Sequence, residues 1–465
     1  MKLNSEQEKA VYCDIEKNVK VVAGAGTGKT RVLVERAIYL ASCDGVEVKK
    51  IRLVSFTKSV ANEIKVRLRD RLGQDAAKVV TTFHRFSRQL LVKCPKSKFR
   101  DYGVLDTKGQ TLLINKCLNK LIPELSEKAK GVASVINYAR SNQECPAQSL
   151  EKRFSIDAEL WKRLFNRYSS AKRKARKLDF NDILLEAESL LNNKSAAKWA
   201  AKRCKFLLVD EAQDLSLSQW NVVNSLIENG TKVFCVGDPA QAIYGFGGAV
   251  VEKFNYFESQ YDGCRVYHLS ENYRSTFNVV NLGNWKRKRI NKTYNHIMSN
   301  GEIGMKPIIC DFADLTSMSD WLAKDLLDKK LKPSELNQVS ILIRARSIGK
   351  IIKARLDEEG IPVRTKHNKY GVKLLTVHKA KGREWDTCYV IDPRLSGTGW
   401  NGMWDRLWND KQTENCLWYV ATTRAKKELT ICSFNLRRAA YSDARKIDDY
   451  IIDAIPNEFL CYKGN

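Results

Sequence analysis

The stretch Val19–Thr30, VKVVAGAGTGKT, constrains the fold of this 465-residue chain more than any other. A β-branched run breaks there into glycines and continues as a helix from Arg31. Gly24, Gly26 and Gly28 allow successive backbone N–H groups to turn toward one anion, and the N-terminus of the next helix favours negative charge at the same place. The stretch therefore predicts a strand, a phosphate-binding loop and a helix in succession.

The two residues that close this loop carry its chemistry. Lys29 would reach the β- and γ-phosphates of a nucleotide, and the Thr30 hydroxyl would ligate Mg²⁺. Ala23 stands where the usual pattern has its first glycine, so the strict motif is missed by one residue. A glycine-rich turn without a ligand is the alternative at this point.

The charge of the chain indicates the class of partner. Lys and Arg number 80 against 53 Asp and Glu, a formal net charge of +27, and such self-repulsion favours an anionic polymer as partner. Nucleic acid is preferred over a membrane surface, because we find neither an apolar run of about 20 residues nor a basic amphipathic anchor. The first residues, MKLNSEQ, lack an apolar signal core, and we expect a cytoplasmic protein, or one in a host's cytoplasm if a virus or mobile element encodes it.

The length predicts about three domains of roughly 150 residues each. The 13 scattered cysteines form no C-x-x-C pair, and we expect them to be reduced and mostly buried. Between Lys93 and about Phe165 a lysine-rich amphipathic pattern with proline breaks predicts an inserted helical subdomain. The basic run 171–177 is explained equally by a solvated helix face and by a phosphate contact.

A short helix is predicted near the N-terminus. Asn4 and Ser5 are typical of an N-cap, and Glu8 lies close to capping-box spacing. Gln7 has an amide that could read the donor and the acceptor on an adenine edge. An exposed helical glutamine is the simpler interpretation.

Polar and aromatic residues follow the predicted strands of the first half. The strand Ile51–Phe56 is followed by Thr57, and the next strand leads to His84 between two phenylalanines. The carboxyl ends of parallel strands form the edge where open α/β sheets hold ligands, and alternating aromatic and basic side chains suit stacked bases and phosphates. Phe83 and Phe86 are equally compatible with the core of the following helix.

Two adjacent carboxylates, Asp210 and Glu211, leave the apolar strand Lys205–Val209. Asp210 can hold the Mg²⁺ that Thr30 also ligates, and Glu211 can take a proton from an attacking water. Isolated Asp-Glu pairs are usually solvated, but this pair follows a buried strand downstream of a phosphate loop. That position favours the catalytic interpretation.

Three further segments carry candidate residues. The buried strand Lys232–Val236 leads to Gln241, whose amide can sense a γ-phosphate, and then to aromatic residues placed to meet bases. Tyr273 and Arg274 adjoin one another. The second half starts a new α/β unit with a strand at Val339–Ile343, a helix at 347–359 and a strand at Val363, followed by the segments 372–385 and 417–432.

Taken in order, these segments resemble the UvrD/Rep/PcrA group of superfamily 1 DNA helicases over nearly the whole chain. The resemblance rests on nine blocks in the family's order: Gln7, AGAGTGKT (23–30), SFTKSVANEI (55–64), TTFHRF (81–86), VDEAQD (209–214), GDPAQAIYGFGGA (237–249), ENYRST (271–276), TVHKAKGREW (376–385) and YVATTRA (419–425).

The resemblance implies an α/β fold of two RecA-like parallel-sheet motor domains. Motor domain 1 would comprise residues 1–92 and 166–280, its helical insertion 93–165, and motor domain 2 residues 281–465. ATP and Mg²⁺ are the implied cofactors, and single-stranded DNA and single/double-strand junctions the implied partners, with replication or repair proteins as further candidates. A monomeric motor without membrane attachment is expected.

The resemblance also carries roles to individual residues. Gln7 would read adenine, Tyr273 would stack on it, and Glu384 would touch the ribose. The implied nucleotide contacts are Gln7, Ala23, Gly24, Ala25, Gly26, Thr27, Gly28, Lys29, Thr30, Arg31, Tyr273 and Glu384. The implied catalytic residues are Lys29, Asp210, Glu211, Gln241, Arg274 and Arg424, with Thr30 and Asp210 as metal ligands. The implied DNA contacts are Phe56, Thr57, His84, Tyr244, Phe246 and His378.

Two departures from the family pattern affect the expected function. Gly247 stands where the family usually has an arginine on the DNA side of a coupling motif. In addition, Val363 is followed almost at once by Val372, which leaves no room for the helical subdomain that interrupts the second motor domain in UvrD-like enzymes.

The implied activity is ATP-driven translocation on single-stranded DNA, 3′→5′ by family analogy, with duplex unwinding in replication, repair or recombination. ATP would draw Arg274 and Arg424 toward Lys29 and close two lobes around itself. The departures leave open an ATP-switched translocase that displaces proteins from single strands without unwinding, as a recombination mediator or a subunit of a larger complex. A P-loop kinase or metabolic ATPase is disfavoured by the net charge and by the arginines of the second half.

Overall fold

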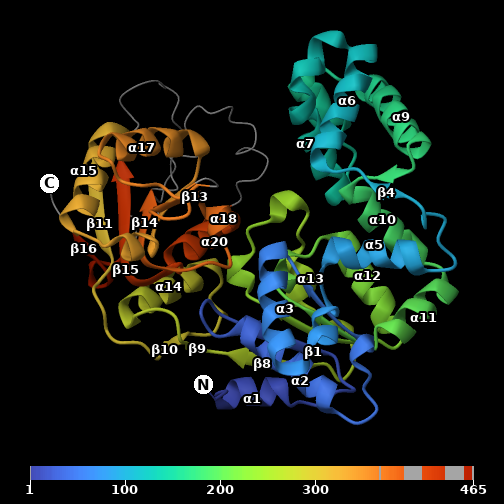
Figure 1. The fold of residues 1–465 in the computed structure, drawn as a ribbon, viewed down its shortest axis with the longest axis horizontal. Coiled ribbons are helices and arrows are strands. Elements are labelled where there is room, and N and C mark those ends of the chain that lie inside the picture. The colour runs from blue at the N-terminus through green and yellow to red at the C-terminus, as the bar shows by residue number, and fades with distance from the viewer. Residues whose placement is uncertain (1, 366–367, 392–410, 435–454, 463–465) are drawn as a thin grey trace. The chain divides into compact units, whose positions relative to one another are not determined.

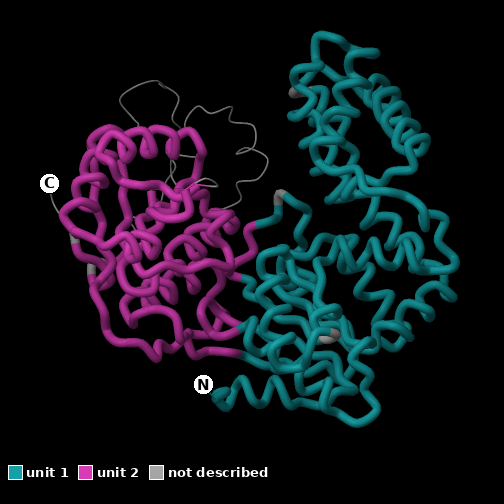
Figure 2. The backbone as a smooth tube through the Cα atoms, in the orientation of Figure 1, with its two compact units in different colours: residues 1–22, 29–239, 244–268 teal, residues 23–28, 240–243, 269–465 magenta. Residues whose placement is uncertain are grey.

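The structure is a computed structural model that describes residues 2–365, 368–391, 411–434 and 455–462 (Figure 1). It divides into two compact units (Figure 2). Unit 1 comprises Met1–Val22, Lys29–Pro239 and Tyr244–His268, and unit 2 comprises Ala23–Gly28, Ala240–Ile243 and Leu269–Asn465. The phosphate-loop residues 23–28 and the segment 240–243 therefore group with the second half of the chain.

The sheet of unit 1 has the strand order β3-β2-β6-β7-β1-β8. The strands from β3 to β1 run parallel to their neighbours. Every residue of β6 is buried, as expected for a parallel sheet covered on both faces. The strands are β1 Val19–Ala23, β2 Ile51–Ser55, β3 Val80–Thr82, β6 Phe206–Val209, β7 Lys232–Gly237 and β8 Arg265–Leu269.

Helices connect these strands. They are α1 Ser5–Val11, α2 Lys29–Ser42, η1 Val48–Lys50, α3 Lys58–Leu72, α4 Gln74–Ala77, α5 Phe83–Lys93, α10 Phe180–Leu191, α11 Lys194–Arg203, η3 Ala212–Asp214, α12 Leu217–Glu228, η4 Pro239–Gln241, η5 Gly245–Gly247, α13 Val251–Asn255 and η6 Glu258–Gln260. Phe83 and Phe86 of α5 are buried in the main core of this unit, which confirms the core interpretation of the two side chains.

A second core lies in the helical part of unit 1, where α6, α7 and α9 pack together (Figure 1). Its elements are β4 Gly103–Val104, α6 Thr107–Leu121, η2 Pro123–Lys128, α7 Ala129–Ser141, α8 Ala147–Phe154, α9 Ala158–Lys174 and β5 Lys177–Leu178. The predicted boundary at residue 165 falls inside α9, whose Leu164 and Tyr168 belong to this core. Lys172, in the basic run, is buried and pairs with Asp179 at 2.6 Å, so the run is only partly a solvated face.

Unit 2 contains a six-stranded sheet of order β13-β12-β14-β15-β11-β16, in which each strand runs parallel to its neighbours. Its strands are β11 Ile308–Phe312, β12 Val339–Ile343, β13 Lys373–Thr376, β14 Trp385–Ile391, β15 Ala425–Phe434 and β16 Cys461–Tyr462. The short strands β9 Glu271–Asn272 and β10 Met298–Ser299 pair separately. The two parallel sheets confirm the predicted α/β class.

The helices of unit 2 are α14 Phe277–Ile290, α15 Leu315–Asp328, α16 Pro333–Leu336, α17 Arg346–Glu358, α18 Val377–Ala380, α20 Lys411–Thr422 and η9 Asn457–Phe459. The predicted boundary at residue 280 falls inside α14. The strand predicted at Val363 is reduced to an isolated bridge with Val372. The 13 cysteines all lie in described ranges, form no disulfide and are mostly buried, as expected.

Among the helices that the structure describes, we find none with the length and apolar character needed to cross a bilayer.

Candidate nucleotide and nucleic-acid site

Gln7 is buried, so the interpretation of this residue as an exposed helical glutamine is wrong. Its exposed fraction is 1%. Asn4 N donates to Gln7 Oε1 at 3.2 Å and Gln7 N donates to Asn4 Oδ1 at 2.7 Å, so Gln7 and not Glu8 completes the capping box of α1. The cap therefore orients the amide that was proposed to read adenine.

The phosphate loop joins β1 to α2, which begins at Lys29, two residues earlier than predicted. Gly26 and Gly28 have φ values of +74° and +88°, which favour glycine. A Cβ on Gly26 would lie 2.5 Å from Asn272 Nδ2, and one on Gly24 would lie 2.4 Å from Ile297 Cδ1. Close contacts with Asn272 and with Ile297 therefore favour glycine at positions 26 and 24, in addition to any role of these glycines in phosphate binding.

The loop is hydrogen-bonded to the segment that carries Tyr273 and Arg274. Asn272 Nδ2 donates to Ala25 O at 2.7 Å, and Tyr273 N donates to Gly26 O at 3.0 Å. Asn272 was not predicted as a site residue, although it stands beside Tyr273 and Arg274 in the same block. The one indication in the sequence was the position of the Asn272 amide next to two predicted site residues, Tyr273 and Arg274.

The two predicted carboxylates occupy the end of β6. Asp210 is 4% exposed, and its N donates to Val54 O at 2.9 Å, which continues the pairing of β6 with β2. Glu211 adopts a left-handed conformation with φ +48°, and its N donates to Asp210 Oδ1 at 3.1 Å. This rare conformation turns the chain sharply between the two carboxylates.

Gln213 holds Glu211 in place. Its Nε2 donates to Glu211 Oε2 at 2.7 Å, and its Oε1 accepts from Asp238 N at 3.0 Å. Gln213 is fully buried, and Asp238 follows the neighbouring strand β7. The amide thus fixes the position of the carboxylate relative to the end of β7. Gln213 was not predicted as a site residue from the sequence.

Gln241 and Arg424, both predicted, contact one another in unit 2. Arg424 Nη2 donates to Gln241 Oε1 at 3.2 Å, and both side chains are buried. Arg424 Nε also donates to Val420 O at 2.8 Å and Nη1 to Arg383 O at 3.3 Å. The guanidinium is thereby oriented by the end of α20.

Arg274 and Glu384, predicted as a phosphate and a ribose contact, form an ion pair. Arg274 Nε donates to Glu384 Oε2 at 2.5 Å and Nη1 donates to Thr423 O at 3.2 Å. Tyr273 is half-exposed, and its hydroxyl donates to Glu271 Oε2 at 2.7 Å. Arg274 is held next to Thr423, the residue that precedes Arg424.

Phe56 and Tyr244 form an aromatic pair, with ring centroids 4.6 Å apart and planes tilted by 33°. Phe56 is 38% exposed at the end of β2. Burial, followed by the charges of Asp214 and Glu211, raises the pKa of Tyr244, so its phenol stays neutral. The side chain of Phe246 lies outside the described residues.

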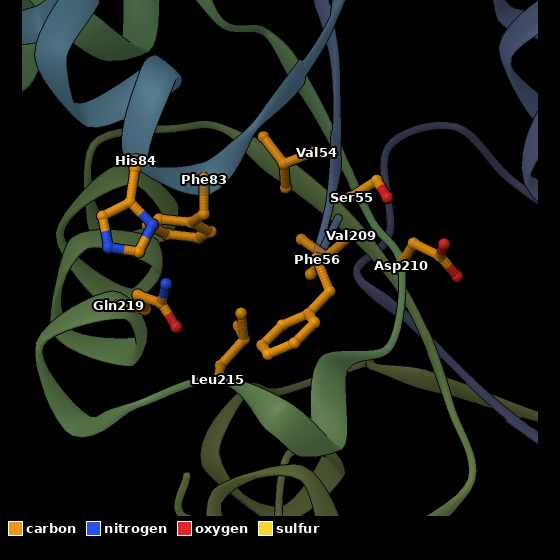
Figure 3. Close-up of a pocket in the computed structure, with 9 residues that line it drawn as sticks. All are labelled: Val54, Ser55, Phe56, Phe83, His84, Val209, Asp210, Leu215 and Gln219. Carbon is orange, nitrogen blue, oxygen red and sulfur yellow. The ribbon is translucent and has the colours of Figure 1, made fainter. Parts of the chain in front are cut away.

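His84 lines a cavity of about 90 Å³ together with Val54, Ser55, Phe56, Phe83, Val209, Asp210, Leu215 and Gln219 (Figure 3). Burial lowers the pKa of His84 to about 4, so at neutral pH the ring is an uncharged aromatic group. Its ring meets that of Phe180 edge-on, with centroids 5.5 Å apart. Phe180, which is 43% exposed, is a further candidate for a DNA contact, and no sequence motif indicated it.

The remaining predicted DNA contacts have local roles. The side chain of Thr57 accepts from Val60 N at 3.3 Å and so caps α3. His378 lies on α18 after β13, and its pKa is lowered to about 4, chiefly by burial and then by Arg344 and Lys381. It is therefore neutral at physiological pH.

A parallel sheet whose first strand runs through a glycine loop into a helix, with carboxylates after an inner strand, defines a nucleotide-binding α/β protein. Comparison with known proteins gives the family. The model described as the UvrD/REP helicase N-terminal domain matches residues 3–262, and the UvrD-like helicase C-terminal domain matches 267–369 and 363–435. The chain belongs to the UvrD-like helicase family, which confirms the resemblance and, at the level of the family, the expected RecA-like fold and enzyme class.

Individual relatives agree with this assignment. The chain is 28% identical to a probable DNA helicase of Mycoplasma pneumoniae over 95% of this chain and 86% of that protein. It is 28% identical to DNA helicase II of Escherichia coli over 78% of this chain and 51% of the relative. It is also 28% identical to the ATP-dependent DNA helicase PcrA of Leuconostoc citreum over 61% and 38%. The matched region thus covers about half of the length of the Escherichia coli protein and less than half of the length of the Leuconostoc citreum protein.

Proposed function

We propose that this chain is an ATP-dependent DNA helicase that moves 3′→5′ along single-stranded DNA and unwinds duplex in replication, repair or recombination. The observation that carries the proposal is the hydrogen bonding of the phosphate loop to residues 272 and 273. An ATP held by that loop would lie beside Tyr273 and Arg274, as ATP hydrolysis assisted by arginine requires.

The proposed chemistry assigns complementary roles to acids and arginines. Lys29 binds the β- and γ-phosphates. Glu211, held by Gln213, takes the proton of the attacking water. Arg274, Arg424 and Gln241 bind the γ-phosphate and stabilise the charge that develops on it. Gln7 and Tyr273 bind the adenine.

The donor set suits Mg²⁺. Asp210 offers a hard carboxylate oxygen at the end of β6 and Thr30 a hydroxyl near the start of α2. Mg²⁺ is bound in many nucleotide sites by one or two protein oxygens together with phosphates and water. When bound, the ion would neutralise phosphate charge and orient the γ-phosphate for attack.

The proposed track for the DNA strand includes Phe56, Tyr244, His84 and Phe180. Because His84 is neutral, its ring would stack on bases as the other three aromatic side chains would, while lysines and arginines elsewhere bind phosphates. Affinity should then fall with salt at a logarithmic slope of about −0.7 for each neutralised phosphate.

The proposed organisation is one motor domain built on each sheet, with α6–α9 as an insertion in the first. A monomer acting on single strands and single/double-strand junctions, with replication or repair proteins as partners, completes the proposal. The proposed location is the cytoplasm, or the cytoplasm of a host if a virus or mobile element encodes the protein.

The test is ATP hydrolysis measured with single-stranded DNA, RNA and duplex, followed by strand displacement on forked substrates of both polarities. We expect ATPase activity stimulated by single-stranded DNA and displacement only from substrates with a 3′ tail. Activity indifferent to nucleic acid would refute the helicase and favour a metabolic ATPase. Displacement from 5′ tails alone would refute the polarity.

A second candidate is a translocase that displaces proteins without unwinding duplex. Among the described residues, no atom lies within 4 Å of a Cβ built on Gly247 in η5, so its neighbours do not require glycine at this position. The connection from α17 to β13 is also short. Displacement of streptavidin from single strands without strand separation would support this candidate, and Gly247→Arg should then increase unwinding.

A further inference from the structure

One buried amide, that of Asn272, links the phosphate loop to the backbone of the arginine segment. Asn272 is 4% exposed. Its Nδ2 donates to Ala25 O at 2.7 Å, while its Oδ1 accepts from Arg274 N and from Ser275 N, each at 2.8 Å. The Asn272 side chain therefore donates to the phosphate loop through its NH₂ group and accepts from the arginine segment through its carbonyl oxygen.

The spacing between the two segments is set by atoms in contact. Tyr273 N donates to Gly26 O at 3.0 Å. A Cβ on Gly26 would lie 2.5 Å from Asn272 Nδ2 and 2.8 Å from Arg274 Cβ, so the loop already approaches as closely as glycine permits. Movement of the loop toward or away from Arg274 would break these contacts.

The segment is fixed at its other end to the strand that follows Arg424. Ser275 Oγ donates to Ala425 O at 2.6 Å, and Thr276 N donates to Lys426 O at 2.9 Å. Hydrogen bonds thus run from the phosphate loop through Asn272 to Ser275 and on to the residue after Arg424. Both proposed phosphate-binding arginines belong to this connected set.

We infer that Asn272 is a positioning residue that sets the distance of Arg274, and through Ser275 that of Arg424, from the phosphate loop. The inference rests on the proposed function, since the spacing affects catalysis only if the loop binds ATP. Asn272 does not contact the nucleotide in this account. It acts by orienting groups that do.

Asn272→Asp tests the donor alone. The carboxylate keeps the acceptor for Arg274 N and Ser275 N but places a second acceptor against Ala25 O. We expect kcat for DNA-stimulated ATP hydrolysis at pH 8 to fall at least about tenfold. ADP affinity should fall less than kcat, because ADP shares the loop that binds the β-phosphate but lacks the phosphate that Arg274 binds.

A pH profile separates positioning from a general loss of structure. Burial and the neighbouring Ala25 O raise the pKa of the introduced carboxyl group, while the N–H groups of Arg274 and Ser275 lower it, and its protonated form can donate to Ala25 O as the amide does. The kcat of the variant relative to the wild type should therefore recover as the pH falls from 8 to 6. Asn278→Asp is the matched control, because Asn278 Nδ2 also donates to a carbonyl, Gly304 O at 2.9 Å, away from the loop.

The outcomes are distinct. An unchanged kcat, or equal losses of kcat and ADP affinity without recovery at low pH, would overturn the inference while leaving the proposed function intact. Absence of DNA-stimulated ATPase in the wild type would overturn both. Circular dichroism shows whether the variant folds. If it does not, Asn272→Ser replaces it, because a hydroxyl can accept from Arg274 N but is too short to reach Ala25 O, and the same kcat and ADP results are expected.

Discussion

The acidic residues proposed for catalysis in unit 1 and the arginines proposed for it in unit 2 are positioned in different ways. Asp210 and Glu211 are positioned by a buried strand, by the left-handed conformation of Glu211 and by the side-chain amide of Gln213. Arg274 and Arg424 are positioned by acceptors of the protein itself, the Glu384 carboxylate and the Val420 carbonyl among them. In the proposed chemistry the arginines would exchange these protein acceptors for phosphate oxygens, whereas Glu211 would act while held by Gln213.

The largest expected effect is on the acidic side. Glu211→Gln should lower kcat by about 10²–10⁴, because the amide cannot accept the proton of the attacking water. Lys29→Ala should also abolish turnover. Steady-state ATPase and single-strand binding are the measurements, and DNA affinity should remain near that of the wild type. Glu228→Gln, an exposed glutamate at the end of α12, is the control. Near-normal hydrolysis by Glu211→Gln or by Lys29→Ala would show that the site is wrongly assigned.

Arg424→Ala should lower kcat by about a thousandfold, the effect of losing an arginine that stabilises phosphoryl-transfer charge. ATP affinity, measured with a non-hydrolysable analogue, should change far less. Arg424→Lys should recover only part of the loss, because an ammonium cannot reproduce the planar set of donors. Equal losses in kcat and affinity would argue against a transition-state role and weaken the contrast between the two regions.

Gln213→Ala should lower kcat by about tenfold, since it releases the Glu211 carboxylate without removing it. Single-turnover hydrolysis is the measurement. The thermal midpoint of the variant shows how much of the loss reflects stability, because Gln213 also accepts from Asp238 N. If kcat is unchanged, backbone alone positions Glu211.

Glu384→Gln should have a smaller effect, a change of about threefold in KM, because Glu384 is half-exposed and such ion pairs contribute little. Comparing ATP with dATP sharpens the interpretation. If Glu384 binds the ribose, the variant loses its preference for ATP. If Glu384 only holds Arg274, both nucleotides are affected equally.

The smallest effect concerns pH. The pKa of His84 in the folded chain is about 4, below the unfolded value near 6.5, so its contribution to stability is complete above pH 6.5 and is lost as the pH falls toward 4. The urea midpoint of the wild type should therefore decrease between pH 7 and pH 5, and that of His84→Gln should decrease less. Identical pH dependence in both proteins would mean that the ring is solvated.

The sequence predicted most of the candidate site residues, but few of the contacts that position their side chains. The residue pattern predicted the loop, the carboxylates and Gln241 because phosphate chemistry requires particular residue types at strand ends, whereas the roles of Arg274 and Arg424 were implied only by the family resemblance. Asn272, Gln213 and Phe180 were not predicted, because their side-chain contacts with Ala25 O, Asp238 N and the His84 ring join segments that are distant in the sequence. The burial of Gln7 was also missed, since propensity alone cannot show that a helical amide completes a cap. The predicted boundaries at 165 and 280 fall inside α9 and α14, and the division into domains stays a prediction.

The central claim is that the acids of unit 1 and the arginines of unit 2 act on one ATP. It is tested most directly by a crystal structure with ADP, Mg²⁺, aluminium fluoride and an oligothymidylate. The account predicts Arg274 and Arg424 nitrogens within about 3 Å of the fluoride that mimics the γ-phosphate, with Lys29 and the water held by Glu211 on the same group. Arginines that remain on Glu384 and Val420 while the analogue is bound would contradict it.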